Sequence, residues 1–247
     1  MATYAIGDIH GRLGALRTLL LKLDPEKDRL VFLGDYVDRG PDSSGVLELL
    51  IQVAQECPKT VFLRGNHDWL MVGSRDDAAR KKYWREKCGG EATLASYPRP
   101  SLGAVPVAHW FFLENTCRDL FETENHIFVH GGVEADLPMA QQSVRQLHWR
   151  RLYDAAPHVS GKRVVCGHTQ QKSGLPLNLG HTLCVDTKDW LTAVNVNTNT
   201  FMQAGNEGQW REFKRLPPVS PVPPRPVEAQ VRAKLPEGVV EEDAEEG

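Results

Sequence analysis

Apolar positions in the first third of the chain alternate between short continuous runs and helical spacing. The runs at residues 3–7, 29–33 and 60–63 predict three buried strands. Between the first two runs, leucines recur every three or four positions, at Leu13, Leu16, Leu19, Leu20 and Leu23. Residues 44–56 repeat this helical pattern. A strand–helix–strand–helix–strand order predicts parallel strands joined by right-handed crossovers.

A polar cluster directly follows each of these strands. The clusters are Gly7–Gly11 (GDIHG), Gly34–Gly40 (GDYVDRG) and Arg64–Asp68 (RGNHD). In an open α/β sheet, ligands bind in the crevice beyond the carboxyl ends of the strands. The pattern therefore predicts that three loops converge on one site.

The rest of the chain predicts a mixed fold. Residues 69–115 look helical and irregular, and we expect a helical insertion over the site. Further strand patterns follow at 127–130, 163–166, 182–185, 191–196 and 201–204. Their close spacing predicts mostly antiparallel pairing. We therefore expect an α/β fold of the mixed, α+β kind.

Composition changes near the end of the chain. Residues 216–226 hold six of the sixteen prolines, and residues 237–247 are dominated by Glu and Asp. Such a stretch buries too little apolar surface to order itself. We expect one domain over 1–215 and a disordered Pro-rich, then acidic, tail over 216–247. A solubilising role is favoured over docking as a polyproline helix.

Charge and cysteine content restrict the class of protein. The net charge of -3 over 247 residues does not suggest a general nucleic-acid binder. No apolar stretch has the length of a signal peptide or a membrane span. The five cysteines are scattered and include no CxxC, which argues against a disulfide framework or zinc–thiolate site. We expect a cytoplasmic protein, monomeric, without membrane or nucleic-acid partners.

Six metal-ligating side chains each fall at the end of a predicted strand: Asp8, His10, Asp35, Asn66, His130 and His168. A single histidine at a strand end is more often structural, but six such positions together indicate a site. Oxygen and imidazole ligands without a thiolate suit manganese, iron, zinc or magnesium. We expect two divalent ions, manganese foremost.

A site with two ions about 3.5–4 Å apart needs a carboxylate that bridges them. The simplest partition places Asp8, His10 and Asp35 on one ion, and Asp35, Asn66, His130 and His168 on the other. Asp35 is then the bridge. Two cations would lower the pKa of a shared water toward neutrality. The expected chemistry is hydrolysis by a metal-activated hydroxide.

Charged neighbours of these positions point to a phosphoryl substrate. Arg39 and Arg64 flank predicted ligands, and Arg150 or Arg151 follows Trp149 in a comparable loop. Guanidinium groups match phosphate oxygens bidentately. His67 follows Asn66, and Asp38 lies in the loop of Asp35. If they meet, the pair can act as a general acid for a departing alkoxide.

The three clusters resemble the GDxHG, GDxVDRG and GNH[DE] motifs of the phosphoprotein phosphatase family of metallophosphoesterases. The resemblance covers roughly residues 1–200 and implies a β-sandwich flanked by helices, with a dinuclear metal site at its edge. It implies the six ligands given above, the Asp38–His67 acid pair, and phosphate binding by Arg39 and Arg64. A Trp-x-Arg pattern in the family selects Arg151 over Arg150.

Within that family, the short chain, the GNHD ending and the segment Gly89–Leu94 resemble bacterial and phage protein phosphatases. One departure concerns the loop at Val185–Trp190, because related bacterial enzymes often read VDTG followed by a glycine pair. We therefore expect this loop near the site to differ in shape from that of the related enzymes. We expect hydrolysis of phosphoserine and phosphothreonine in a phosphorylated protein or peptide.

Two alternatives differ in substrate or class. A symmetrical diadenosine tetraphosphate hydrolase would use the same scaffold, although such relatives typically lack the aspartate found here as Asp38. An inactive binding module acting through the Pro-rich tail would not need the intact ligands, arginines and acid pair.

Overall fold

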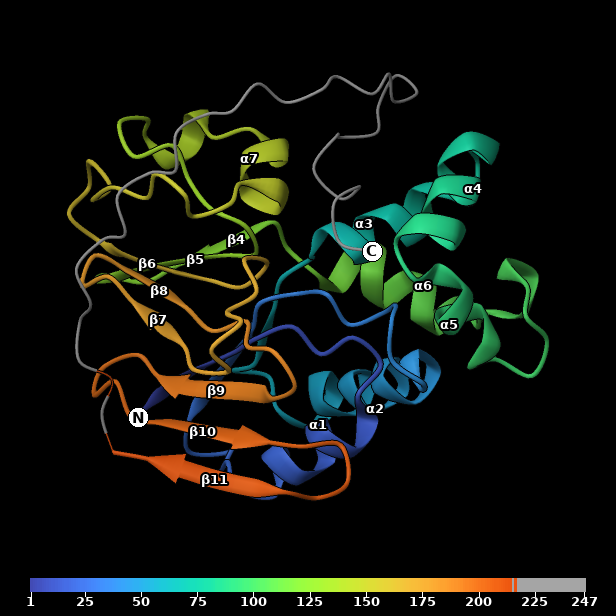
Figure 1. The fold of residues 1–247 in the computed structure, drawn as a ribbon, viewed down its shortest axis with the longest axis horizontal. Coiled ribbons are helices and arrows are strands. Elements are labelled where there is room, and N and C mark those ends of the chain that lie inside the picture. Colours follow the sequence, from blue (N-terminus) through green and yellow to red (C-terminus); the bar gives the residue numbers. More distant parts are fainter. Residues whose placement is uncertain (215, 217–247) are drawn as a thin grey trace.

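Two β-sheets lie face to face in a computed structural model of the chain (Figure 1). One has six strands in the order β11–β10–β9–β1–β2–β3, and the other five in the order β4–β5–β6–β8–β7. The structure describes residues 1–214 and residue 216. The tail expected over 216–247 therefore lies outside the described residues, apart from Leu216.

The strands of the six-stranded sheet are β1 Thr3–Ile6, β2 Arg29–Phe32, β3 Val61–Phe62, β9 Leu191–Asn195, β10 Phe201–Ala204 and β11 Trp210–Phe213. Those of the five-stranded sheet are β4 Leu120–Glu122, β5 His126–Val129, β6 Arg163–Cys166, β7 Leu177–Asn178 and β8 Thr182–Cys184. The helices are α1 Leu13–Leu20, α2 Ser43–Glu56, α3 Asn66–Gly73, α4 Ala78–Lys87, α5 Gly90–Ala95, α6 Val107–Phe111 and α7 Val144–Trp149, with a π-helical turn η2 at Phe112–Thr116. The mixed α/β class is thus confirmed.

Alternation along the strands fills three layers of core, one between the sheets and one on each outer face. Val31 of β2 and Val165 of β6 point into the space between the sheets, where Phe128 also lies. Their neighbours Phe32 and Val164 point to the outer faces. Helices α1 and α2 cover the outer face of the six-stranded sheet, and α7 covers that of the five-stranded sheet. Burial on both faces explains why these strands read as continuous apolar runs.

Strand pairing differs in part from the sequence expectation. β1, β2 and β3 are parallel as predicted, and β9 pairs antiparallel with β10. The mainly antiparallel arrangement expected for the later strands is wrong for β5, β6 and β8, which run parallel. The connections between them explain the difference, because α7 lies between β5 and β6 and allows a crossover.

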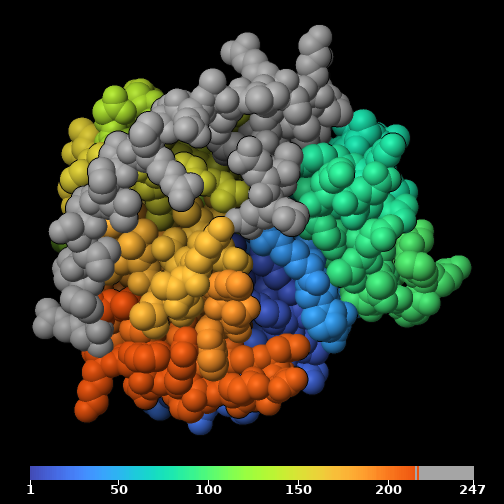
Figure 2. All heavy atoms as spheres, in the orientation of Figure 1, coloured from blue at the N-terminus to red at the C-terminus, as the bar shows by residue number. Residues whose placement is uncertain are grey.

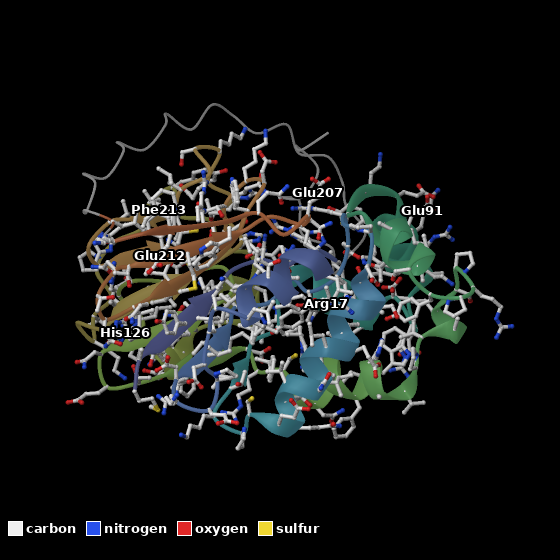
Figure 3. The ribbon with its side chains drawn as sticks, turned by 90° about the horizontal axis from the view of Figure 1, so that it is seen from below. Arg17, Glu91, His126, Glu207, Glu212 and Phe213 are labelled. Carbon is white, nitrogen blue, oxygen red and sulfur yellow. The ribbon has the colours of Figure 1, made fainter. Side chains whose placement is uncertain are left out.

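The helical insertion, residues 69–115, holds most of α3 followed by α4, α5 and α6. It forms a lobe on one side of the molecule (Figure 2). In the view from below, Glu91 of α5 lies at the end of the molecule opposite His126 and Phe213 (Figure 3). Among the described residues, no helix combines the length and apolar character that crossing a membrane requires.

Replacing Gly7 with alanine tests how closely the sheets meet. The added methyl carbon would lie 2.5 Å from the carbonyl oxygen of Val185, which follows β8, so one backbone must shift. We expect the free energy of unfolding to fall by about 1–3 kcal/mol, as is typical of overpacking. Thermal unfolding should show a lower Tm.

Gly103→Ala provides the matched control, because its new carbon would meet only the Ser101 hydroxyl at 3.8 Å. Its Tm should stay near the wild-type value, as for most surface substitutions. Equal Tm values for Gly7→Ala and the wild type would contradict the close approach of the sheets.

Candidate metal centre

Three loops from one sheet meet as predicted. Asp8 and His10 follow β1, Asp35 follows β2, and Asn66 begins α3 after β3. The backbone N–H of His10 donates to the carbonyl oxygen of Asp35 at 2.8 Å, and the N–H of His67 donates to Asp35 Oδ1 at 3.0 Å. Backbone hydrogen bonds therefore fix the three loops to one another.

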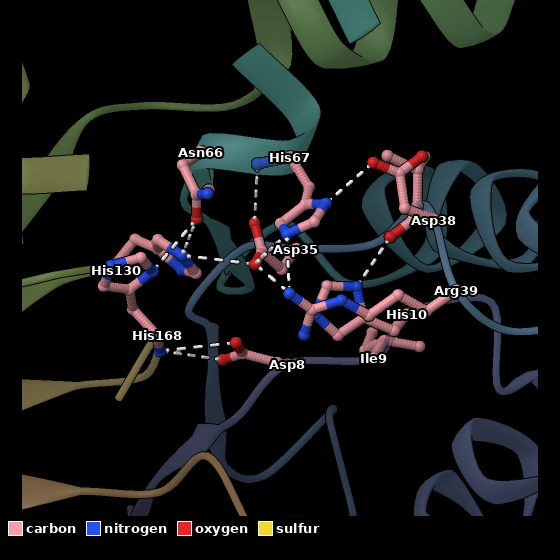
Figure 4. A network of polar contacts seen from close by, with 12 residues as sticks. Asp8, Ile9, His10, Asp35, Asp38, Arg39, Asn66, His67, His130 and His168 are labelled. Atoms are coloured by element: carbon pink, nitrogen blue, oxygen red, sulfur yellow. Dashed lines mark hydrogen bonds and ion pairs between the residues drawn. The ribbon is translucent and has the colours of Figure 1, made fainter. Parts of the chain in front are cut away.

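The second sheet supplies the remaining two histidines. His130 follows β5 and His168 follows β6, and because these strands are parallel both residues emerge at the same edge. The N–H of His168 lies 3.3 Å from each carboxylate oxygen of Asp8 (Figure 4). The site thus lies where the edges of two sheets meet, and it unites all six predicted ligands.

Asp35 lies at the centre of this cluster. Its Oδ2 atom is 3.4 Å from Nε2 of His130 and 3.5 Å from Nε2 of His10. Two groups of donor atoms within 4.8 Å share it: Asp35 with His10 and His67, and Asp35 with Asp8 and His130. A carboxylate common to both groups fits a bridging position. The grouping differs from the predicted partition, since Asp8 lies with His130.

Backbone carbonyls orient three of the imidazoles. Nδ1 of His10 donates to the carbonyl of Val37 at 2.8 Å, and Nδ1 of His130 donates to that of Leu33 at 2.9 Å. Nε2 of His168 donates to the carbonyl of Trp149 at 3.1 Å. The ring nitrogen left over in each case faces the cluster. Outer hydrogen bonds of this kind are what metal-binding histidines use to fix their tautomer.

Three acceptor atoms converge beside Asp35. Asn66 Oδ1 lies 2.9 Å from His130 Nε2 and 3.1 Å from His168 Nδ1. When the opposite ring nitrogens carry the protons, all three atoms present lone pairs to one point. A cation satisfies such an arrangement, and oxygen with imidazole is a donor set that divalent first-row metals accept. The residues present therefore fit a metal centre.

Electrostatics agree with a cation-binding role. The six predicted ligands are at most 8% exposed. Burial raises the pKa of Asp8, and the charge of His130 only partly offsets this effect. Burial also disfavours a charged His130, but the carboxylates of Asp35 and Asp8 outweigh it and raise the pKa of His130 to about 10. The buried carboxylates therefore favour a positive charge beside them, because a buried charge needs a partner of opposite sign or a metal ion.

Strained backbone is concentrated at the site. Seven non-glycine residues among those described have positive φ, and five of them belong to the cluster: His10, Asp35, Asp38, Arg39 and His168. A left-handed conformation costs about 1–3 kcal/mol for such residues. Strain of this size persists only where the surroundings hold it, which is typical of functional sites.

His67 and Asp38 lie in contact, as the predicted acid role requires. His67 Nδ1 lies 2.7 Å from Asp38 Oδ2, and His67 Nε2 lies 4.0 Å from Asp35 Oδ2. Burial lowers the pKa of His67, but the charge of Asp35 and the hydrogen bond to Asp38 raise it above its ordinary value. The imidazole therefore presents Nε2 to the cluster while Asp38 holds its far side (Figure 4).

The predicted phosphate-binding arginines differ in position. Arg39 points into the cluster, with Nη1 at 3.3 Å from His10 Nε2 and Nη2 at 3.1 Å from His67 Nε2. Arg64 instead donates to the carbonyls of Leu113 and Glu114 at the π-helical turn, at 2.9 and 3.0 Å. Phosphate binding by Arg64 stays a prediction. To bind phosphate, Arg64 would have to break these hydrogen bonds or use its remaining N–H groups.

Arg151 remains a better candidate than Arg150. Arg150 is held in ion pairs with Glu134 at 2.6 Å and Asp154 at 3.0 Å. The positive charge of Arg151 contributes to the lowered pKa of His168, after burial and the charge of His130. Phosphate binding by Arg151 stays a prediction.

Three side chains that support the site are not among the predicted residues. Asp68 accepts the backbone N–H groups of Asp35, Tyr36 and Gly65 at 2.8, 2.9 and 2.9 Å, which joins the second loop to the third. Trp84 and Thr93, from the helical insertion, both bond to Asp38. The last position of the GNHD motif was a signal for Asp68.

Similarity to known proteins extends over most of the chain. Residues 1–197 match the sequence profile of the calcineurin-like phosphoesterases. A symmetrical bis(5'-nucleosyl)-tetraphosphatase of Methylococcus capsulatus is 42% identical over 85 residues, which cover 34% of this chain and 30% of that protein. The aligned stretch therefore spans less than a third of the length of this curated relative.

Solved structures share the fold. One of a candidate diadenosine tetraphosphatase has a TM-score of 0.59 and 19% identity, covering 87% of this chain and 93% of that one. The cold-active protein-tyrosine phosphatase of a psychrophilic Shewanella has a TM-score of 0.56 and 17% identity, covering 85% and 79%. With a profile match over most of its length, the chain belongs to the calcineurin-like phosphoesterase family.

Proposed function

We propose that this chain is a metal-dependent hydrolase of phosphomonoesters of alcohols, with phosphoserine and phosphothreonine in proteins as the expected substrates. The observation that carries the proposal is the His67–Asp38 pair at 2.7 Å, set beside the buried donor cluster. An alkoxide is a poor leaving group and departs much more easily when a positioned acid protonates it. An acid pair is therefore of most use to an enzyme for alkyl esters.

Divalent cations bound between the donors would neutralise phosphoryl oxygens and lower the pKa of water. The side chains of the chain itself hold and protonate the substrate. The guanidinium of Arg39 contacts both His10 and His67. It would bind a phosphate through two parallel hydrogen bonds. His67 delivers the proton from Nε2 to the leaving oxygen, while Asp38 keeps the ring in its orientation.

Symmetrical hydrolysis of dinucleoside tetraphosphates is the second candidate. The names of the relatives support it better than they support a protein phosphatase, since the curated match and one solved structure carry tetraphosphatase names. A nucleoside diphosphate is a better leaving group than an alkoxide and depends less on an acid. Asp38, in contact with His67, supports the phosphomonoester proposal instead.

A side-by-side assay separates the two candidates. Purified enzyme with manganese is given a phosphoserine peptide and diadenosine tetraphosphate, and kcat/KM is measured for each. We expect the higher value on the phosphopeptide. A preference for diadenosine tetraphosphate with release of ADP would instead establish the second candidate, and no turnover of either would favour a binding module.

Replacing His67 with asparagine tests the acid role. Turnover of the phosphopeptide should fall by about 10²–10⁴-fold, the usual contribution of a general acid. p-Nitrophenyl phosphate should lose far less, because p-nitrophenolate leaves without a proton. His181→Asn, at a partly buried histidine whose ring bonds to the neighbouring Thr182, is the control. Equal losses on the two substrates would refute the acid role.

Asp35→Asn tests the shared ligand. Calorimetric titration of the wild type with manganese should give two ions per chain. The variant should lose affinity by about 100-fold or more, since even changes outside the ligand set cost 10–100-fold. Asp24→Asn is the matched control, because this exposed carboxylate pairs with Lys27 only at the surface. Undiminished binding of two ions by Asp35→Asn would contradict the bridging position.

A further inference from the structure

We propose that Trp84 and Thr93 are positioning residues for the acid pair, through which the helical insertion fixes Asp38 and thereby the ring of His67. This inference rests on the proposed function and adds two residues to it. Neither belongs to the three sequence motifs, and both approach Asp38 from α4 and α5.

Asp38 is a fully buried carboxylate that accepts hydrogen bonds on both oxygens. Trp84 Nε1 donates to Oδ2 at 2.8 Å and to Oδ1 at 3.0 Å, and Thr93 Oγ1 donates to Oδ1 at 2.7 Å. His67 Nδ1 shares Oδ2 at 2.7 Å. Two donors from the insertion thus act on the same carboxylate as the acid.

The directions of these bonds are fixed by chemistry. An indole N–H can only donate, so Trp84 must point at the carboxylate oxygens. The hydroxyl of Thr93 accepts the backbone N–H of Asp38 at 2.7 Å, which leaves its own hydrogen for the carboxylate. Side chain and backbone of Asp38 are therefore held together by one threonine. The carboxylate cannot turn without breaking several of these bonds.

Glycines in the insertion permit this approach. A Cβ atom on Gly90 would collide with the indole ring of Trp84, and one on Gly89 would lie 2.8 Å from the backbone nitrogen of Arg39. The carbonyl of Gly89 accepts the N–H of Arg39 at 3.3 Å. Both Asp38 and Arg39 have positive φ, of 73° and 63°. The segment Gly89–Leu94 therefore packs directly against the loop that carries Asp38 and Arg39.

A positioning role makes a selective prediction. Loss of either donor should let Asp38 and His67 shift, and misplacement by about 1 Å can cost 10²-fold in rate. Only substrates that need the proton should suffer. Thr93→Val keeps the side-chain volume, whereas Trp84→Phe keeps an aromatic ring but leaves a small cavity at a buried position. Thr93→Val is therefore the less perturbing of the two variants.

The test measures kcat and KM for a phosphoserine peptide and for p-nitrophenyl phosphate with the manganese-loaded enzyme. Each variant should lose about 10–100-fold in kcat on the peptide, with KM little changed and p-nitrophenyl phosphate turnover near wild type. Thr93→Ser, which restores the hydroxyl, should recover the peptide activity. Tyr97→Phe is the matched control, since it removes a buried hydroxyl on the same insertion that bonds to His109 and not to Asp38.

Equal losses on the two substrates, or none on either, would overturn the positioning role while leaving the proposed function intact. A wild-type enzyme that cleaves only the activated aryl ester would overturn both. Because Trp84→Phe and Thr93→Val remove different donors, a folding defect in one leaves the other as the test.

Discussion

A buried carboxylate that several imidazoles face is the constraint on which this site depends. Asp35 is 2% exposed and has a left-handed backbone, with φ of 53°. Burial alone would favour its neutral form, but the charges of His130 and His67 hold its pKa well below the ordinary value. Such a group is stable only in positive surroundings. The histidines, the arginine and the metal-binding role all follow from that requirement.

The arrangement of the two sheets brings the histidines to the buried Asp35 carboxylate. Parallel strands in each sheet direct loops to one edge, and Asp68 ties two of these loops together through three backbone N–H groups. Gly7 lets the end of β1 approach Val185 across the sheets. Close packing of the sheets is therefore what brings His130 and His168 to Asp35, although more than 90 residues separate them in the sequence.

The sequence predicts well those structural features that depend on residues close together in the chain. The strands at 3–7 and 29–33 and the ligands after them follow from local pattern and turn chemistry. The parallel pairing of β5, β6 and β8 contradicts the expectation from spacing, because the segment between β5 and β6 holds α7 and is long enough for a crossover. β7, with two residues, carries no periodic signal at all.

The features that the sequence did not predict depend on contacts between segments that are far apart in the chain. Arg64 was expected to face phosphate because it flanks Asn66, yet the carbonyls of the π-helical turn accept its N–H groups. Trp84 and Thr93 gave no signal because their partner, Asp38, lies 46 and 55 positions away. Only the fold shows that the insertion holds the carboxylate of Asp38.

The central claim is that Asp35 lies between two bound ions. Anomalous diffraction at the manganese edge, from crystals grown with excess manganese, tests it directly. We expect two peaks, one on each side of the Asp35 carboxylate and within bonding distance of the surrounding histidines and Asn66. A single peak at saturating metal, or peaks remote from Asp35, would contradict it.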